Sequence, residues 1–182
     1  MSVTYLFLAQ GFEEVEAIAV VDVLRRGGVD VRTVSITDDH QVTGAHQVTV
    51  QTDLSLEQIQ AEEAVCLIFP GGMPGAQKLS ECEPLIRVLQ QHFDRKKMVA
   101  AICAAPALIL SRLKTTEKLR VTCYPGFEKY LSDFDVVADG VVVDGKVITG
   151  KGPGFAVKFG LTVLEQLRSA EVAAEVAAGM LL

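Results

Sequence analysis

The chain is poor in the residues that metal and disulfide sites need in number. Its 182 residues contain no tryptophan, three histidines and four cysteines, and no two of the cysteines form a C-x-x-C pair. This spacing supports neither a zinc knuckle nor a disulfide framework, and three histidines make a histidine-rich metal site unfavourable. We therefore expect no metal, no cofactor and a reducing compartment.

Charge and hydropathy exclude further classes of protein. The net charge of −6 gives no reason to expect nucleic acid or an anionic membrane surface as a partner. The N-terminus has no basic segment, and the longest uncharged run, residues 98–111, is interrupted by Pro106 and is too short to cross a bilayer. Length and the 49% share of hydrophobic residues predict one folded domain, residues 1–182, in a soluble cytoplasmic protein.

Apolar, β-rich runs alternate with segments of helical periodicity. The expected strands cover residues 3–9, 29–36, 64–72 and 98–102, with hairpins at 42–50 and 141–149; the expected helices cover 14–26, 83–95, 104–113, 154–168 and 171–178. A short helix is expected to begin at Asp53 or Ser55. This alternation predicts an α/β fold with a mostly parallel sheet covered by helices on both faces. Sites in such sheets collect at the carboxyl ends of the strands, which selects the loops at 10–16, 70–75 and 103–106.

Cys103 lies in "AAICAAPALIL", at the junction of an expected strand and an expected helix. A cysteine at an arbitrary position is most often a small buried hydrophobe, and Cys66, inside an apolar strand, is interpreted in that way. At a strand-to-helix junction, unpaired backbone amides and the helix dipole favour a thiolate, and the turn resembles a nucleophile elbow. We therefore predict that Cys103 is reactive.

The glycine-rich loop after the third expected strand could support that chemistry. In "FPGG" two adjacent glycines would let backbone amides approach a ligand closely, although an ordinary tight turn is the alternative. The amide of Gly72, together with that of Ala104, is predicted to form an oxyanion hole.

The loop after the first expected strand, "GFEEVE", places three carboxylates together. Glu13 and Glu14 suit the N-terminal end of a helix dipole. Glu16 taken alone would face solvent. Turned into a cleft, it would be kept neutral by desolvation and could act as a general acid or base.

Other segments are interpreted as structural. "GKVITGKG" at 145–152 nearly matches a phosphate-binding loop, but its β-branched middle and missing terminal hydroxyl argue against nucleotide binding. "GKGPG", which contains Pro153, is expected to start the following helix close to the site. His92 is expected on a solvated helix face and His40 in a loop.

Taken in order, five segments of the chain resemble the ThiJ/PfpI superfamily. They are "GFEEVEA", "VVDVLRRGGV", "FPGGMPGAQKLSE", "AAICAAPALIL" and "GKGPGFAVKFGLTVLE". The likeness is strongest to the branch typified by the Parkinson-disease protein (DJ-one), and it covers nearly the whole chain. It implies a flavodoxin-like three-layer α/β sandwich that forms a homodimer. It also implies that Cys103 is the oxidation-prone nucleophile, that Glu16 is a buried carboxyl hydrogen-bonded to its sulfur, and that Gly72 and Ala104 supply backbone amides.

The resemblance implies two functions. One is an enzyme acting on small 2-oxoaldehydes, of the glutathione-independent glyoxalase or deglycase type, which turns methylglyoxal into lactate. The alternative is a non-enzymatic sensor of oxidative stress, or redox chaperone, working through oxidation of Cys103. Ala104 stands where the protease-like branch has a histidine, which argues against a peptidase or a glutamine amidotransferase.

Two positions depart from the family pattern. Tyr124 stands where relatives often have a histidine near the thiol, and a phenol, which titrates near ~10, is a weaker proton shuttle at neutral pH. His46 stands where relatives often have an arginine that reaches the site from the partner subunit. We expect these two residues to be neighbours of the site. Gly71 and Pro153 are expected as further neighbours.

Overall fold

A seven-stranded sheet forms the centre of the molecule, in the order β10-β11-β7-β6-β1-β2-β5. The structure, a computed structural model, describes residues 3–182, so the first two residues of the expected 1–182 domain lie outside it. The strands are β1 (Val3–Leu8), β2 (Val31–Ser35), β5 (Leu54–Ser55), β6 (Ala64–Phe69), β7 (Met98–Ile102), β10 (Val141–Asp144) and β11 (Val147–Gly150). Every neighbouring pair is parallel except β10 with β11. The predicted mostly parallel α/β sheet is confirmed.

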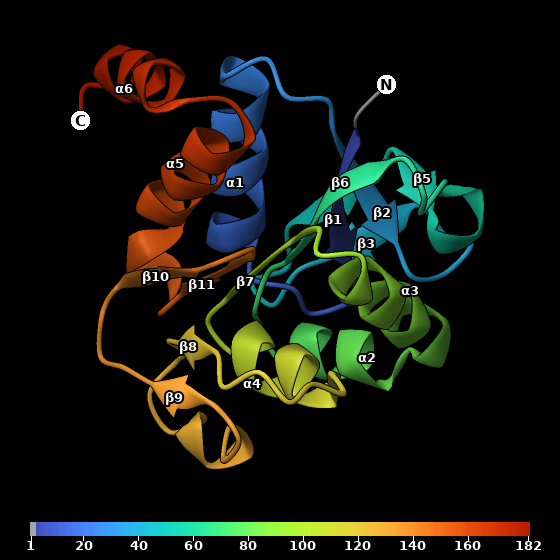
Figure 1. Cartoon of the computed structure of the whole chain (residues 1–182). Coiled ribbons are helices and arrows are strands. Elements are labelled where there is room, and N and C mark those ends of the chain that lie inside the picture. The colour runs from blue at the N-terminus through green and yellow to red at the C-terminus, as the bar shows by residue number, and fades with distance from the viewer. Residues whose placement is uncertain (1–2) are drawn as a thin grey trace.

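Helices cover both faces of this sheet. They are α1 (Glu14–Arg26), α2 (Gly75–Glu81), α3 (Glu83–Asp94), α4 (Ala105–Ile109), α5 (Ala156–Leu167) and α6 (Ala170–Gly179). Figure 1 shows α1 and α5 side by side on one face and α2, α3 and α4 on the other, while α6 packs against α5. The result is the expected three-layer sandwich.

The central strands are apolar because both of their faces are covered. All five residues of β7, "MVAAI", are buried, and so are all but one residue of β6, "AVCLIF". Continuous apolar runs of this kind are typical of parallel strands that lie between two helical layers. On the α1 side, Gly160 of α5 lets that helix approach α1 closely, because a methyl group there would lie 3.3 Å from Val23 Cβ.

The structure shortens some predicted helices and adds short elements. The helix expected at 104–113 ends at Ile109 and continues as a 3-10 turn, η2 (Leu110–Arg112). The helix expected at 154–168 begins at Ala156, after the 3-10 turn η4 (Pro153–Phe155). Helix α2 and the two-residue strands β8 (Arg120–Val121) and β9 (Asp135–Val136) were not predicted, because segments this short carry too little periodicity.

Both predicted hairpins are present. The first joins β3 (Gln41–Thr43) to β4 (Thr49–Gln51), and the second joins β10 to β11 with Gly145 at a φ of 56° in the turn. Residues 145–152, which nearly match a phosphate-binding loop, contain the strand β11 in their middle, as expected.

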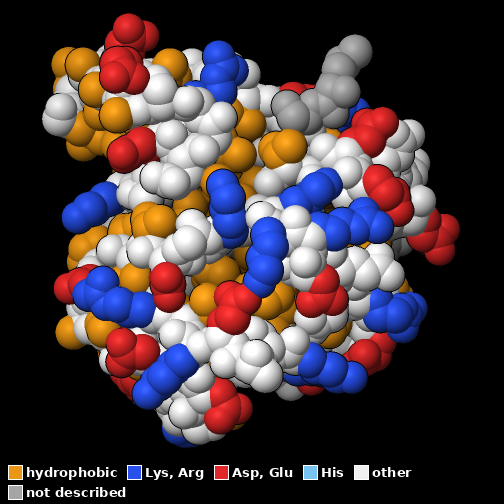
Figure 2. Space-filling model, in the orientation of Figure 1, with side chains coloured by type: hydrophobic (Ala, Val, Ile, Leu, Met, Phe, Trp, Pro, Cys, Tyr) orange, Lys and Arg blue, Asp and Glu red, His pale blue; other side chains and the backbone are white. Residues whose placement is uncertain are grey.

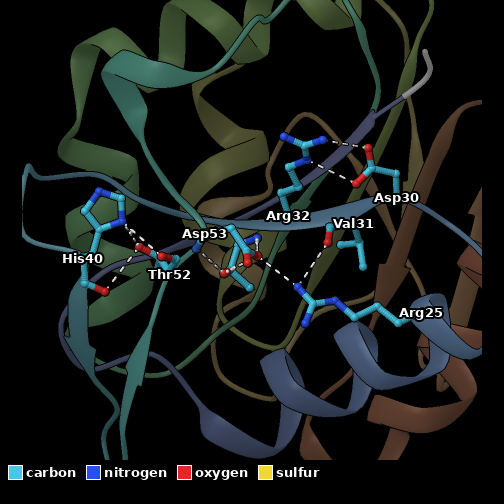
Figure 3. A network of polar contacts seen from close by, with 8 residues as sticks. Arg25, Asp30, Val31, Arg32, His40, Thr52 and Asp53 are labelled. Carbon is cyan, nitrogen blue, oxygen red and sulfur yellow. Dashed lines mark hydrogen bonds and ion pairs between the residues drawn. The ribbon is translucent and has the colours of Figure 1, made fainter.

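Asp53 fastens the edge of the sheet rather than capping a helix (Figure 3). Its Oδ2 accepts hydrogen bonds from the Thr33 amide at 2.8 Å, from the Thr33 hydroxyl at 2.9 Å and from the Arg25 guanidinium at 2.9 Å. These contacts join the start of β5 to β2 and to α1. Ser55, the other predicted cap, does precede a 3-10 turn, η1 (Leu56–Gln58), and its amide donates to the Gln58 side chain at 2.8 Å.

Basic and acidic side chains alternate over the face of the molecule shown in Figure 2. Across residues 3–182, no helix combines the length and the apolar character that a membrane span requires.

Candidate active site

The three loops selected from the sequence meet at the carboxyl edge of the sheet. They follow β1, β6 and β7. A hydrogen bond of 2.7 Å joins two of them: the Gly71 amide, after β6, donates to Oε2 of Glu16, after β1. From β1 the sheet extends through β2 in one direction and through β6 and β7 in the other. The loops therefore meet at the point where the strand order reverses, which is the usual ligand position in open α/β sheets.

Cys103 occupies a strained turn between β7 and α4. Its φ is 67°, in the left-handed region that a residue with a side chain rarely adopts, and its surface is 8% exposed. The Cys103 amide donates to the Gly150 carbonyl, and its carbonyl accepts from the Tyr124 amide, both at 2.8 Å. Such strain persists only where surrounding contacts hold it, and it is concentrated at functional sites.

The glycines of "FPGG" are required for the loops to approach one another. A methyl group on Gly71 would lie 2.6 Å from Cys103 Cβ, 2.9 Å from Cys103 Sγ and 2.8 Å from Glu16 Oε2. Gly72 has a φ of 87°, and a methyl group there would lie 2.3 Å from the Glu13 amide nitrogen. A larger residue at position 71 would push Cys103 and Glu16 apart, and one at position 72 would overlap the backbone of the loop before α1.

Glu16 is fully buried beside the sulfur, and this burial raises its pKa from 4.5 to about 7. The hydrogen bond from the Gly71 amide and the contact with Cys103 act in the opposite direction but are weaker. Its second oxygen, Oε1, has no hydrogen-bond partner among the residues that the structure describes. A carboxyl group with one oxygen fixed and the other free, close to neutrality in pKa, suits proton transfer.

The protonation state of Cys103 differs from the sequence-based expectation. Burial raises the pKa of the thiol, and the charge and contact of Glu16 raise it further; the amides of Ala104 and Gly72 lower it by less. A raised pKa favours the thiol over the thiolate, which is the opposite of the direction expected from the helix dipole. Helix α4 has only five residues, so few peptide dipoles act on the sulfur, whereas buried Glu16 contacts it. Cys103 and Glu16 titrate as a coupled pair.

The backbone amides of Gly72 and Ala104 lie near enough to Cys103 to lower the pKa of its thiol. Their service as an oxyanion hole for a substrate stays a prediction.

The remaining cysteines lie in other surroundings, and all four are free. Cys66 is fully buried in β6 and burial raises the pKa of its thiol, as expected for a core residue. Burial, with a smaller effect of Glu128, raises the pKa of Cys123 to about 11. Cys82 is half-buried between α2 and α3.

Tyr124 and Pro153 lie beside the Cys103 turn. The Tyr124 amide binds the Cys103 carbonyl, and its side chain is 45% exposed, with its ring against Gly152. Pro153 follows Gly152 directly and begins η4.

His46 contacts carboxylates of its own chain and not Cys103. Its Nδ1 lies 3.0 Å from Glu14 Oε2 and 3.6 Å from Glu13 Oε1, and its amide donates to Glu14 Oε1 at 2.7 Å. The hydrogen bond to Glu14 and the charge of Glu13 raise the pKa of the exposed imidazole. The Val48 amide also donates to Glu14, so this carboxylate joins the β3–β4 hairpin to the start of α1.

Sequence reasoning missed this role of Glu14 because its partners lie more than thirty residues further along the chain. Glu13, Glu14 and His46 each place a potential metal-ligand atom within 4.8 Å of the others. Both oxygens of Glu14 are already occupied by the hairpin, which accounts for the cluster without a metal.

A cysteine held at a positive φ, a buried acid against it and two amides at the sulfur define a nucleophile-elbow site on a flavodoxin-like fold. Residues 2–166 match the DJ-1/PfpI family, and the chain belongs to that family. It is 37% identical over 170 residues to protein DJ-1 homolog B of Arabidopsis thaliana, covering 93% of this chain and 39% of the relative. It is 36% identical over 181 residues to the Parkinson disease protein 7 homolog of Danio rerio, covering 97% and 95%. The chain spans less than half the length of its two Arabidopsis relatives.

A relative with a named activity is the glutathione-independent glyoxalase DJR-1.2 of Caenorhabditis elegans. The chain is 33% identical to it over 161 residues, which cover 87% of this chain and 84% of the relative. Among solved structures, Drosophila melanogaster DJ-1beta superposes with a TM-score of 0.94 at 33% identity, covering 100% and 99% of the two chains. Toxoplasma gondii DJ-1, oxidized, also gives 0.94, at 32% identity and with 98% and 97% covered. These structures confirm the flavodoxin-like fold.

Proposed function

We propose that the chain is a cysteine-dependent enzyme that converts small 2-oxoaldehydes into 2-hydroxy acids without glutathione. The observation that carries this proposal is the buried Glu16 beside Cys103. Its Oε2 accepts the hydrogen bond from the Gly71 amide, and its Oε1 has no hydrogen-bond partner among the described residues. The named activity of the Caenorhabditis elegans relative supports the same substrate class. We propose that it acts in a reducing compartment, the cytoplasm.

The first step follows from the protonation of the pair. With Cys103 resting as a thiol, ionised Glu16 takes the thiol proton as the sulfur attacks the aldehyde carbon. The proton passes to the former aldehyde oxygen, giving a hemithioacetal. In this mechanism the amides of Gly72 and Ala104, which lower the pKa of the thiol, stabilise the developing oxyanion.

The next steps move two more protons and add water. Glu16 removes the proton from the hemithioacetal carbon and returns it to the neighbouring keto carbon, while the hemithioacetal hydroxyl proton passes to the keto oxygen. The keto group thereby becomes an alcohol and the hemithioacetal a thioester. Water then hydrolyses the thioester, releasing the 2-hydroxy acid and restoring the thiol. The aldehyde carbon is oxidised and the keto carbon reduced within one molecule, so no external oxidant is needed.

Removing the charge of Glu16 tests the proposal. Glu16→Gln keeps the size of the side chain but cannot accept a proton, so lactate formation from methylglyoxal should fall at least ~100-fold. The wild-type rate should rise as the pH increases through about 7, the pKa of Glu16, and the variant should lose this rise. Lactate is measured by chromatography, and Glu165→Gln, on the exposed side of α5, is the matched control. Full activity of Glu16→Gln would refute the role of this carboxyl group.

A second candidate function, a peroxide sensor or redox chaperone, is favoured by the donors around the sulfur. Amides of Gly72 and Ala104 and protonated Glu16 could stabilise oxygens added to Cys103. One solved relative, from Toxoplasma gondii, is described as oxidized. Peptide mapping after treatment with mild peroxide tests this second function. The function requires Cys103 to oxidise before Cys66, Cys82 and Cys123.

We further propose that the chain forms a homodimer through the outer face of α1. Val15 and Ile18 are exposed one turn apart on α1, and Val48 is exposed on the hairpin that Glu14 joins to that helix. Large apolar side chains grouped on one face are typical of protein contacts.

A further inference from the structure

A row of aromatic side chains lies beside the Cys103 turn. The Tyr124 amide donates to the Cys103 carbonyl at 2.8 Å, which fixes the backbone of Tyr124 next to the reactive residue. The centroids of the Tyr124 and Phe127 rings are 6.3 Å apart at an interplanar angle of 80°, and the Phe127 and Tyr130 centroids are 6.0 Å apart. Edge-to-face contact of this kind stabilises a ring orientation.

The Tyr124 ring is also held from the side of β11. A methyl group on Gly152 would lie 3.2 Å from Tyr124 Cδ2, so the ring packs directly on that glycine. Gly150, two residues earlier, accepts the hydrogen bond of the Cys103 amide. The ring therefore packs on the segment that continues β11, two residues beyond the carbonyl that binds the Cys103 amide.

This ring is held in place but only partly covered. Its side chain is 45% exposed, whereas Phe127 behind it is half-buried in the loop. An aromatic surface that is fixed on one side and open on the other binds planar apolar groups well, because stacking adds to the burial of apolar area. A single apolar contact of this size discriminates between substrates by roughly 10- to 200-fold.

We propose that Tyr124 sets the substrate preference of the Cys103 site and favours 2-oxoaldehydes with an aryl substituent over those with a methyl group. The ring supplies a wall for the substituent, while Cys103 and Glu16 act on the two carbonyl carbons. This inference rests on the proposed function and adds a substrate class to it. Tyr124 is a specificity-determining residue here, and no proton transfer is assigned to its hydroxyl group.

Kinetics with two matched aldehydes test the preference. We expect a higher kcat/KM for phenylglyoxal than for methylglyoxal in the wild type. Tyr124→Ala should lower kcat/KM for phenylglyoxal roughly 10-fold or more, mainly through KM, and change the methylglyoxal value less than about 3-fold. Tyr124→Phe should keep the preference, because the ring remains. Tyr130→Ala, at the far end of the aromatic row, is the control and should change neither value.

Alkylation of the Cys103 thiol tests the contact between the Tyr124 ring and a bound substituent without requiring turnover. The rates of Cys103 modification by N-phenylmaleimide and N-methylmaleimide are measured by peptide mapping, with Cys82 of the same molecule as the internal reference. The phenyl-to-methyl rate ratio should be higher at Cys103 than at Cys82, and Tyr124→Ala should remove this difference.

The kinetic and alkylation measurements distinguish the proposed function from the proposed role of Tyr124. If the wild type converts neither aldehyde, the proposed function fails, and the maleimide ratio alone decides the role of Tyr124. Equal effects of Tyr124→Ala on both aldehydes or on both maleimides would overturn the inference. A Cys103 that reacts with neither maleimide would also overturn it, because the ring would then not border an accessible thiol.

Discussion

The chemistry of Cys103 depends on a carboxyl group that the sequence places far away. Glu16 and Gly71 are separated by 55 positions, yet their hydrogen bond holds the acid against the sulfur. Burial raises the pKa of both partners and so favours the neutral form of each. In the proposed mechanism the nucleophile is therefore generated by proton transfer from the thiol to Glu16.

His92 shows the same effect of burial on a histidine. It was expected on a solvated helix face, but it is buried against β7, where its Nε2–H donates to the Met98 carbonyl at 2.9 Å. Its Nδ1 has no partner among the described residues. The periodicity of α3 contained the necessary signal, because His92 lies three and seven positions after the buried Leu89 and Leu85.

His92 should make the protein less stable in mild acid. Burial lowers its pKa from 6.5 to about 4, so below pH 6.5 the unfolded chain binds a proton that the folded chain does not. The stability contributed by neutral His92 is complete above pH 6.5 and is lost as the pH falls towards 4, by roughly 3 kcal/mol in all.

The free energy of unfolding in urea, measured between pH 4 and 7.5, tests this effect. His92→Gln keeps an N–H donor but does not titrate, so its stability should vary less over this range than that of the wild type. Equal pH dependence of the two proteins would contradict the assignment.

At the level of elements, the site exists because two loops of different strands come into van der Waals contact. The loop after β6 can approach the loop after β1 only where side chains are missing, at Gly71 and Gly72. The hairpin β3–β4 is added to the same region by Glu14. These contacts explain why "FPGG" and "GFEEVE" indicate a site when they are considered together, although neither motif does so alone.

Gly71→Ala should separate the sulfur from the acid. The new methyl group would overlap Cys103 and Glu16, so activity towards methylglyoxal should fall at least ~100-fold, since misplacement of catalytic groups by about 1 Å has effects of this size. Lactate formation and thermal unfolding are measured together, which separates a damaged site from an unfolded protein.

Gly154→Ala serves as the control, because a methyl group at Gly154 meets no atom within 4 Å and the residue lies in η4 beside the site. Activity of Gly71→Ala equal to that of this control would show that the close packing is not required.

For the molecule as a whole, the exposed apolar residues of α1 and the adjacent hairpin suggest how two chains would associate. Ile18 is one of these exposed residues and lies on the helix that also carries Glu16. A dimer through α1 would therefore place two active sites close to the shared interface.

Ile18→Asp should convert the dimer into a monomer. A carboxylate at the centre of an apolar contact loses its hydration without gaining a partner, which costs several kcal/mol. Sedimentation velocity measures the change. Val143→Asp, an equally simple change at an exposed valine of β10, should leave the dimer intact. A monomeric wild type, or a dimeric Ile18→Asp, would contradict this interface.

Local patterns determined the order of elements, the parallel sheet and the selection of three loops, because hydrophobic periodicity and strand-to-helix junctions are properties of neighbouring residues. Cys103 could be chosen on that basis, and resemblance to the family added Glu16. Short elements such as α2, β8 and β9 could not be predicted, because their two to seven residues are stabilised by contacts with distant segments.

Only the tertiary structure decided which groups are charged. Whether Cys103, Glu16 and His92 carry a proton depends on how much water surrounds them and on which dipoles and charges lie within a few ångströms. Those surroundings are assembled from loops and helices far apart in the chain. The sequence could therefore identify the reactive residue and, through the family resemblance, expect Tyr124 near it. The direction in which burial shifts the pKa of Cys103, and the packing of the Tyr124 ring on Gly152, required the fold.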